Sequence, residues 1–506
     1  MSNFQLRIFF ILTGIISLLT LIIFSHWVFP FTTDSIFYIT TAQQITLGKG
    51  LLYKNVFVNI APEYTPNSLN PPGYPILIAL LSLTGLNAYT AGLLIPRFFF
   101  LLLPFLMFVI CKRLMPQRAS LVASVIGTFT FGMITCSLMA WSDVPYLFFS
   151  LLSIGMVFQI IEQGGESNLG FILLAGIILG VTYLTRYIGL TLMASVGLVW
   201  LACLILKVFS LRNFLRASII YGSGVALAVI PYLIRNKVVF GSFLSYTSPK
   251  QPSSFLVNAQ DYLRELSHMI FTIPFFDKAV LGIIILTAGL FLAQSKSWIR
   301  ENKKKFAFNL LIFSYFMIYS LFFIMFKSIY YAPEAINERY LIPVEWILMA
   351  GIIWIISVGL SSLNKFQPID VQAIAGLMVL SFILIQIFPA TDFCFFQKRI
   401  KDYSAKIEHY VPLVCNLPPE YVVVTNVSDL TYLLCPRDVR ALSWFTPYGV
   451  AAYLGAKRKC AVFISKENEL LSSSSQYAPT WTDPSQVGYR KTFSDPNVDL
   501  FLFSAR

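Results

Sequence analysis

The chain has 506 residues, of which 57% are hydrophobic and only 12% are charged, and its mean hydropathy is +0.72. Soluble domains carry about 25% charged residues, so this composition excludes a soluble globular protein and indicates a polytopic membrane protein. The net charge of +13 does not indicate nucleic-acid binding, because the lysines and arginines gather in short loops between apolar runs, where they set membrane topology.

The predicted membrane spans begin near the N-terminus. Arg7 precedes a long apolar run without a small-residue cleavage site, which predicts an uncleaved anchor helix rather than a signal peptide. Apolar runs of about 17–25 residues can cross a bilayer as helices. The sequence predicts about eleven of them, at 7–29, 88–111, 119–140, 145–162, 169–185, 187–206, 217–234, 275–293, 306–326, 341–360 and 372–389.

The basic residues between these spans predict their orientation. Lysines and arginines concentrate in the loops 112–118, 207–216 and 294–305, and Lys365 lies between the last two predicted spans. Cytoplasmic loops carry such an excess of positive charge. We therefore expect the N-terminus to be cytoplasmic and the C-terminus to lie outside, in a multi-pass protein typical of a bacterial plasma membrane.

The outer loop 30–87 is long but contains no complete span. Its apolar run 76–86 is too short to cross and is typical of a helix lying in the membrane interface. The sequence Asn70-Pro-Pro-Gly-Tyr-Pro75 just before it predicts an extended turn. We expect two interfacial helices around a Pro-rich bend.

The composition changes after Pro389. Residues 393–506 alternate candidate strands with candidate helices and predict a small extracytoplasmic α/β domain behind a membrane domain of residues 1–392. The expected strands are 421–425, 440–444, 460–465 and 499–503, and the expected helices are 428–434 and 448–457. Four cysteines (Cys394, Cys415, Cys435 and Cys460) either form disulfides there or remain buried thiols.

Asp34 lies just past the first predicted span, in the segment Phe31-Thr-Thr-Asp-Ser35. An ionisable residue at a membrane boundary is a functional candidate, because desolvating it is costly. The alternative is a solvated carboxylate that caps the following helix, a role that Asp fills well.

Further polar residues lie at the outer ends of other predicted spans. They are Asp143 in Trp-Ser-Asp-Val-Pro, Arg186 in Leu-Thr-Arg, Arg235 with Asn236, Arg339 with Tyr340, and Arg97 early in the second span. Each also has a structural interpretation. In it, Asp143 serves only as a helix cap, and the arginines only extend their charged ends to the lipid head groups. Their gathering on one side of the membrane predicts a common cavity.

This set of side chains suits one kind of chemistry. Arginines at head-group level bind a lipid phosphate through charge-assisted contacts. A carboxylate in the same cavity either deprotonates a hydroxyl group or, with a second acid, holds a divalent cation. A phosphate leaving group, a lipid carrier and a hydroxyl acceptor together describe glycosyl transfer from a polyprenyl-phosphate sugar.

Seven short motifs carry a family resemblance in chain order. They are Asp34 with Tyr38, Ala42, Leu47 and Gly48, the bend Pro71–Pro75, Arg97, Ser142–Pro145, Leu184–Arg186, Arg235–Asn236, and Arg339–Pro343. With them the chain resembles the GT-C superfamily of integral-membrane glycosyltransferases. It is most similar to bacterial relatives of protein O-mannosyltransferases and of aminoarabinose transferases that modify lipid A.

The resemblance implies a GT-C fold and assigns roles. Asp34 matches the general base and Asp143 a second catalytic acid, and the two are candidate ligands of a divalent cation, Mg²⁺ or Mn²⁺. Arg186 and Arg339, with Arg97 and Tyr340, match positions that bind the donor phosphate. The chain departs from the family where Ser35 follows Asp34 and where Asn70 precedes the Pro-rich bend, although Glu63 offers another carboxylate in that loop.

The expected function is an inverting transfer to a hydroxyl group of a protein, lipid or glycan, with no nucleic-acid partner. One alternative is a transporter or flippase of lipid-linked sugars. Transport sites usually lie near the bilayer midplane, whereas the charged residues here cluster at one boundary. Another alternative is a scaffold or receptor, which leaves Asp34, Asp143 and the arginines without a role.

Overall fold

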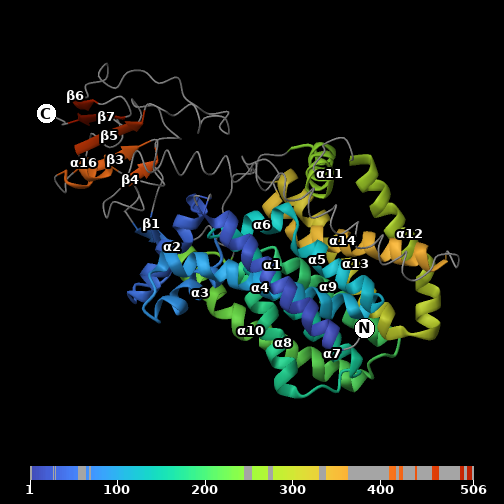
Figure 1. Cartoon of the computed structure of the whole chain (residues 1–506). Coiled ribbons are helices and arrows are strands. Elements are labelled where there is room, and N and C mark those ends of the chain that lie inside the picture. The colour runs from blue at the N-terminus through green and yellow to red at the C-terminus, as the bar shows by residue number, and fades with distance from the viewer. Residues whose placement is uncertain are drawn as a thin grey trace. The chain divides into compact units, whose positions relative to one another are not determined.

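The computed structural model describes most of the helical part of the chain and parts of its C-terminal region (Figure 1). The described residues are 3–26, 28, 30–54, 64–67, 70–243, 253–271, 277–329, 338–362, 409–417, 421–425, 439–441, 459–465, 490–494 and 498–503. The chain forms two compact units. Unit 1 comprises Met1–Ser25, Ser68–Leu77 and Leu93–Phe393, and unit 2 comprises His26–Asn67, Ile78–Gly92 and Cys394–Arg506.

Long apolar helices make up most of the described chain, which is an integral, multi-pass membrane protein. Eight helices are long and apolar enough to cross a bilayer, or nine if the bent pair α5 and α6 counts as one span. These helices are α1 (Asn3–Ser25), α4 (Ala88–Leu114), α5 (Gln117–Thr128), α6 (Phe131–Leu138), α7 (Asp143–Glu162), α9 (Gly189–Ile205), α10 (Leu211–Phe240), α12 (Asp277–Glu301), α13 (Lys303–Ile329) and α14 (Glu338–Ser362). They lie where the sequence predicts spans, although the predicted number of eleven is not shown.

Three predicted spans differ from this simple pattern. The span 169–185 is the shorter helix α8 (Leu169–Thr185), and the span 372–389 lies outside the described residues. The span 119–140 is two helices, α5 and α6, bent by 52°. Thr130 causes the break, because it caps α6 by accepting a hydrogen bond from the Met133 N–H at 3.3 Å and donates one to Glu345 Oε2 at 2.9 Å.

Helix α7 is the most deeply buried of the candidate membrane spans in the described part of the chain. Around it, α8 packs against α10, α9 against α13, and α14 against α5, as Figure 1 shows. The 20 residues of α7 span about 30 Å, so its two ends lie on opposite sides of the unit.

The end of α7 at Glu162 meets basic residues from two neighbouring helices. Arg113 Nε, at the end of α4, donates to Glu162 Oε1 at 2.9 Å. Lys304 Nζ, at the start of α13, donates to the Glu162 carbonyl at 2.6 Å. The predicted basic loops 112–118 and 294–305 therefore lie at the same end of unit 1.

Unit 2 contains helix α2 (Thr33–Thr46) and an antiparallel strand pair, β1 (Leu52–Lys54) and β2 (Tyr64–Pro66). The unit boundary runs through α3 (Gly73–Ser82) and α4. Helices α2 and α3 match the two short helices predicted around the Pro-rich bend. The strand pair was not predicted.

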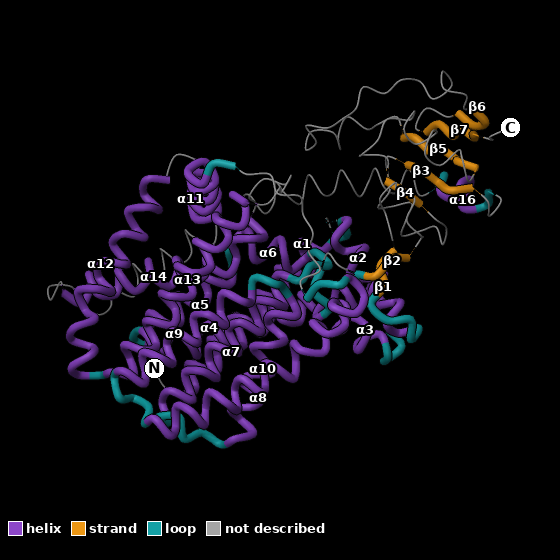
Figure 2. The backbone as a smooth tube through the Cα atoms, turned by 180° about the vertical axis from the view of Figure 1, so that it is seen from behind, coloured by secondary structure: helices purple, strands orange, loops and turns teal. Residues whose placement is uncertain are grey.

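The C-terminal part of unit 2 holds a five-stranded sheet in the order β4-β3-β5-β7-β6 (Figure 2). Strand β3 is parallel to β4 and β5, and β7 is antiparallel to β5 and β6. The described elements of this region are α16 (Val411–Cys415), β3 (Tyr421–Thr425), β4 (Val439–Ala441), β5 (Lys459–Ser465), β6 (Arg490–Ser494) and β7 (Val498–Phe503).

Four of these strands lie where the sequence predicts them, and β6 was not predicted. The expected helices 428–434 and 448–457 lie outside the described residues. Cys415 forms a disulfide. Helix α11 (Phe255–Phe271), between α10 and α12, was also missed; it is amphipathic, with one apolar face.

Candidate functional site

Three helix ends of unit 1 bring charged side chains together. Asp143 occupies the first turn of α7, Arg186 follows the last residue of α8, and Arg339 lies in the first turn of α14. The positive end of the α7 dipole favours a carboxylate at this place. The three residues are far apart in sequence, and packing of the three helix ends makes them neighbours.

Asp143 binds both arginines. Arg186 Nη1 donates a hydrogen bond to Asp143 Oδ1, and Arg339 Nη2 lies 3.6 Å from Asp143 Oδ2. The Asp143 side chain is 1% exposed, whereas those of Arg186 and Arg339 are 17% and 10% exposed. The guanidinium groups can therefore face a ligand, while the carboxylate faces its own arginines. Two guanidinium groups held next to each other in this way suit an anion with several oxygen atoms.

Aromatic rings fix the other faces of the two arginines. The guanidinium carbon of Arg339 lies 3.9 Å from the centre of the Trp141 ring. The same atom of Arg186 lies 5.6 Å from the centre of the Tyr340 ring. Cation–π contacts of this kind hold a guanidinium group in place without neutralising it. The cluster is thus preorganised before any ligand arrives.

Buried tyrosines support this cluster. The hydroxyl of Tyr319 donates to the carbonyl of Tyr340 at 2.6 Å, which fixes the backbone beside Arg339. Tyr146, one turn after Asp143, shares a hydrogen bond with Tyr315 at 3.0 Å between their hydroxyl oxygens. The sequence analysis missed both Tyr315 and Tyr319. Their spacing of four residues in a Phe-rich span places them on one helix face, which was a readable signal.

The backbone around Arg186 depends on two glycines. Arg186 is extended (φ −150°, ψ 134°) and ends α8. A Cβ on Gly189 would lie 2.8 Å from the Tyr183 backbone, so the chain can fold back there only with glycine. A Cβ on Gly73, in the Pro-rich bend, would lie 2.6 Å from the Leu184 carbonyl oxygen. The bend therefore packs directly on the turn that presents Arg186.

The structure places the other predicted site residues as follows. Tyr340 belongs to the cluster through its contacts with both arginines. Arg97 is half-buried in α4, and no ion pair among the described residues joins it to Asp143. Its part in phosphate binding stays a prediction.

Asp34 lies in unit 2, in the first turn of α2. The N-cap position of that helix belongs to Thr32, whose backbone N–H donates to Ser35 Oγ at 3.1 Å. Thr32, and not Asp34, is therefore the capping residue of α2. Its role as a base stays a prediction.

The residues around Asp143 do not fit a divalent cation. Such ions take several oxygen ligands with net negative charge, whereas both Asp143 oxygens face guanidinium groups. Within the described residues, no three His, Cys, Asp or Glu side chains are grouped as metal ligands. We therefore derive no chemical step through a metal at Asp143, and the role of Asp34 as a metal ligand stays a prediction.

Comparison with known proteins gives a family match and several similar structures. The family model of dolichyl-phosphate-mannose-protein mannosyltransferases matches residues 85–247. No curated protein sequence matches the chain. The match covers Asp143 and Arg186, with the helices that carry them.

Similar folds occur in solved membrane proteins. ArnT from Cupriavidus metallidurans, bound to undecaprenyl phosphate, aligns with 12% identity and a TM-score of 0.57, over 99% of this chain and 98% of its own. AglB from Archaeoglobus fulgidus, an oligosaccharyltransferase in complex with an inhibitory peptide and a dolichol-phosphate, aligns with 11% identity and a TM-score of 0.58, over 96% and 73%. The oligosaccharyltransferase of A. fulgidus with Zn and sulfate aligns with 12% identity and a TM-score of 0.60, over 97% and 72%.

These proteins are GT-C membrane glycosyltransferases, and the chain shares their fold. The fold that the resemblance implied is thereby confirmed.

Proposed function

We propose that this protein transfers a sugar from a polyprenyl-phosphate donor to a hydroxyl acceptor on the outer side of the membrane. One observation carries the proposal: Asp143 holds two partly exposed guanidinium groups side by side. The similar ArnT and AglB structures contain a polyprenyl phosphate and a dolichol-phosphate. A lipid phosphate is the anion that such a cluster suits.

In this proposal Arg186 and Arg339 bind the donor phosphate. Paired guanidinium donors match phosphate oxygens in charge and geometry. Asp143 positions both arginines. The Trp141 ring packs against the guanidinium group of Arg339, and the Tyr340 ring packs against that of Arg186. Because the donors are fixed in advance, they stabilise negative charge as it develops on the leaving phosphate without further reorganisation.

The transfer is an in-line displacement with inversion at the anomeric carbon. The acceptor oxygen forms a bond to that carbon while the bond from the carbon to the phosphate oxygen breaks. The electron pair of the broken bond stays on the lipid phosphate, whose charge Arg186 and Arg339 compensate. The proton of the acceptor hydroxyl passes to the carboxylate of Asp34, the general base.

Asp34 enters the proposal through the family resemblance and its place in the first turn of α2. Loss of a positioned base lowers rates by about 10²–10⁴. We expect Asp34→Asn to insert normally and lose transfer by that factor. Asp261→Asn is the matched control, since Asp261 is an exposed acid of α11 paired with Arg264. Near wild-type turnover in Asp34→Asn would remove Asp34 from the reaction.

The reaction class is tested with purified protein in vesicles, radiolabelled polyprenyl-phosphate sugars and membrane extract. We expect the label to move to an acceptor and the unglycosylated lipid phosphate to appear in equal amount. Movement of the intact lipid-linked sugar across the vesicle membrane, without release of the phosphate, would instead identify a transporter.

A further inference from the structure

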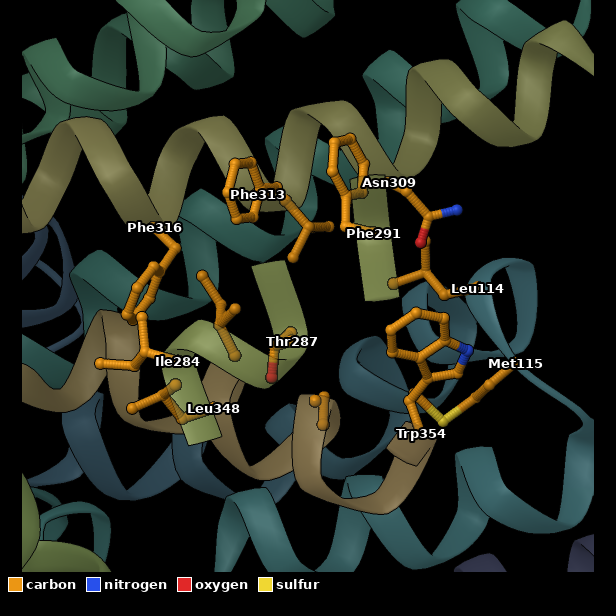
Figure 3. Close-up of a pocket in the computed structure, with 14 residues that line it drawn as sticks. Leu114, Met115, Ile284, Thr287, Phe291, Asn309, Phe313, Phe316, Leu348 and Trp354 are labelled. Carbon is orange, nitrogen blue, oxygen red and sulfur yellow. The ribbon is translucent and has the colours of Figure 1, made fainter. Parts of the chain in front are cut away.

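A slot with a cavity volume of about 80 Å³ lies between α12, α13 and α14. Figure 3 shows the side chains that line it. Its lining is almost entirely apolar and includes Phe291, Phe313 and Trp354. Along α13 it runs from Asn309 to Phe316, which is about 10 Å of helix. It lies near the basic end of unit 1, since Leu114 at the end of α4 also lines it.

Two polar residues of the slot, Thr287 and Asn309, each donate a hydrogen bond to a carbonyl of their own helix. Thr287 Oγ1 donates to the Ile283 carbonyl at 2.7 Å, and Asn309 Nδ2 donates to the Lys305 carbonyl at 2.8 Å. The slot therefore suits a hydrocarbon chain better than a polar ligand. Helix α12 forms one wall, and at 11% it has the lowest buried share among the candidate spans of the described chain. The slot is thus next to the lipid.

Positive charge lies beside one end of the slot. The end of α12 and the start of α13, called the basic turn 296–305 below, carry five basic residues against the single acid Glu301 of that segment, namely Lys296, Arg300, Lys303, Lys304 and Lys305. Lys305 is one helical turn from Asn309. The last turn of α4 adds Lys112, beside Arg113, which is paired with Glu162. An anionic head group placed here would meet several cations at once.

Two tryptophans link this charge to the slot. Lys305 Nζ lies 5.8 Å from the centre of the Trp298 ring, and the rings of Trp298 and Trp354 are 6.1 Å apart. Trp354 lines the slot itself. Tryptophan prefers the zone between head groups and acyl chains, so this pair marks the depth at which the two parts of a lipid meet.

We infer that the slot binds one acyl chain of an anionic phospholipid whose head group lies against the basic turn 296–305. The order of features along α13 matches that of the lipid: cations, then tryptophans, then an apolar slot. Charge complementarity selects an anionic lipid over a zwitterionic one. The inference is independent of the proposed glycosyl transfer, because the slot shares no residue with the Asp143 cluster.

The head-group part is tested by titrating purified protein with phosphatidylglycerol and phosphatidylcholine and counting retained lipids by native mass spectrometry. We expect the wild type to retain one phosphatidylglycerol more tightly than phosphatidylcholine. Arg300→Gln with Lys303→Gln should weaken phosphatidylglycerol binding by about fivefold per charge and leave phosphatidylcholine unchanged. Arg7→Gln with Lys207→Gln, two exposed cations elsewhere, should change neither. Equal affinity of the wild type for both lipids would overturn the inference.

The acyl-chain part is tested by filling the slot. An ideal Cβ on Gly351 lies 3.6 Å from Thr287 Cγ2, an ordinary contact, so Gly351→Leu fits at its root and occupies the slot with its remaining carbons. This variant should lose both lipids while eluting from size exclusion as the wild type does. Unchanged lipid retention would contradict an acyl chain in the slot.

Fluorescence of Trp354 tests the same point without relying on the folding of the Gly351→Leu variant. Phosphatidylglycerol with brominated acyl chains quenches tryptophan fluorescence on contact. We expect part of the quenching to disappear in Trp354→Phe and to persist in Trp141→Phe. Identical quenching in the wild type and in Trp354→Phe would place the chain elsewhere.

Discussion

Helix α7 carries one acid at each end, and the two ends differ in what surrounds the acid. Asp143 is 1% exposed and meets two arginines that are backed by aromatic rings. Glu162 is 38% exposed, and its partner Arg113 is 22% exposed. Both ends gather basic side chains around one carboxylate, so the number of charges does not distinguish them.

Burial and aromatic packing are what separate a candidate site from a topology signal. A partly exposed pair such as Arg113–Glu162 contributes about 0–1 kcal/mol to stability, because water screens it. A buried carboxylate with fixed guanidinium groups keeps its electrostatic strength and can direct it at a ligand. The comparison therefore favours the Asp143 end as the site for the donor phosphate.

Neutralising each acid in turn should give the largest difference between the two ends of α7. Asp143→Asn leaves two poorly solvated guanidinium groups without their carboxylate, and we expect a loss of about 3–5 kcal/mol in stability. Glu162→Gln should cost at most about 1 kcal/mol. Thermal unfolding of the two variants in detergent measures the difference. Equal losses would show that the two ends do not differ in burial.

Arginine truncations give the next largest effect. Arg339→Ala removes a charged donor to the phosphate, a contact of about 1.5–3 kcal/mol, so donor affinity should fall about 10- to 100-fold. Arg113→Ala, at the other end of unit 1, should leave donor affinity unchanged. Binding of a labelled polyprenyl phosphate to the two variants checks this. Unchanged affinity in Arg339→Ala would remove that arginine from the phosphate site.

Gly73→Ala tests how the Pro-rich bend positions Arg186. The added methyl group would lie 2.6 Å from the Leu184 carbonyl oxygen, and overpacking of this kind costs about 1–3 kcal/mol. Gly155→Ala, in the middle of α7, meets nothing within 4 Å and is the control. We expect Gly73→Ala to weaken donor binding as well as stability. If Arg186 is displaced, combining it with Arg186→Ala should add little further loss of affinity.

Trp141→Leu gives the smallest expected effect. It removes the cation–π contact with Arg339, worth about 0.5–2 kcal/mol, and should raise the KM for the donor several-fold. Phe158→Leu, a buried aromatic residue near the other end of α7, should lower stability without changing this KM. Steady-state kinetics separates the two outcomes. A similar KM change in both variants would point to general loosening of α7.

Hydropathy predicted most of the helices because a membrane-spanning helix needs a long run of consecutive apolar residues, which can be read directly from the sequence. It could not predict the break between α5 and α6, since the signal is a hydrogen bond from Thr130 to Glu345, 215 positions away. Glu345 itself is an intramembrane acid with no exposed surface, and this readable signal was overlooked. The strands β1, β2 and β6 were missed because short edge strands carry little pattern.

The residues of the site were predicted better than their pairing. Sequence position placed Asp143, Arg186 and Arg339 at the same boundary, and the structure brings them into one cluster. That both arginines would contact Asp143, which argues against a metal there, could not be predicted, because it depends on how three distant helix ends pack. Trp141 was noted only as part of a motif, because a cation–π contact depends on how distant helix ends meet.

The most direct test of the account is an experimental structure of the protein with a bound polyprenyl phosphate. We predict phosphate oxygens within hydrogen-bonding distance of the guanidinium groups of Arg186 and Arg339, with Asp143 still paired to both. A phosphate bound elsewhere, with the two arginines in contact only with Asp143 and the aromatic rings, would contradict the proposed donor site.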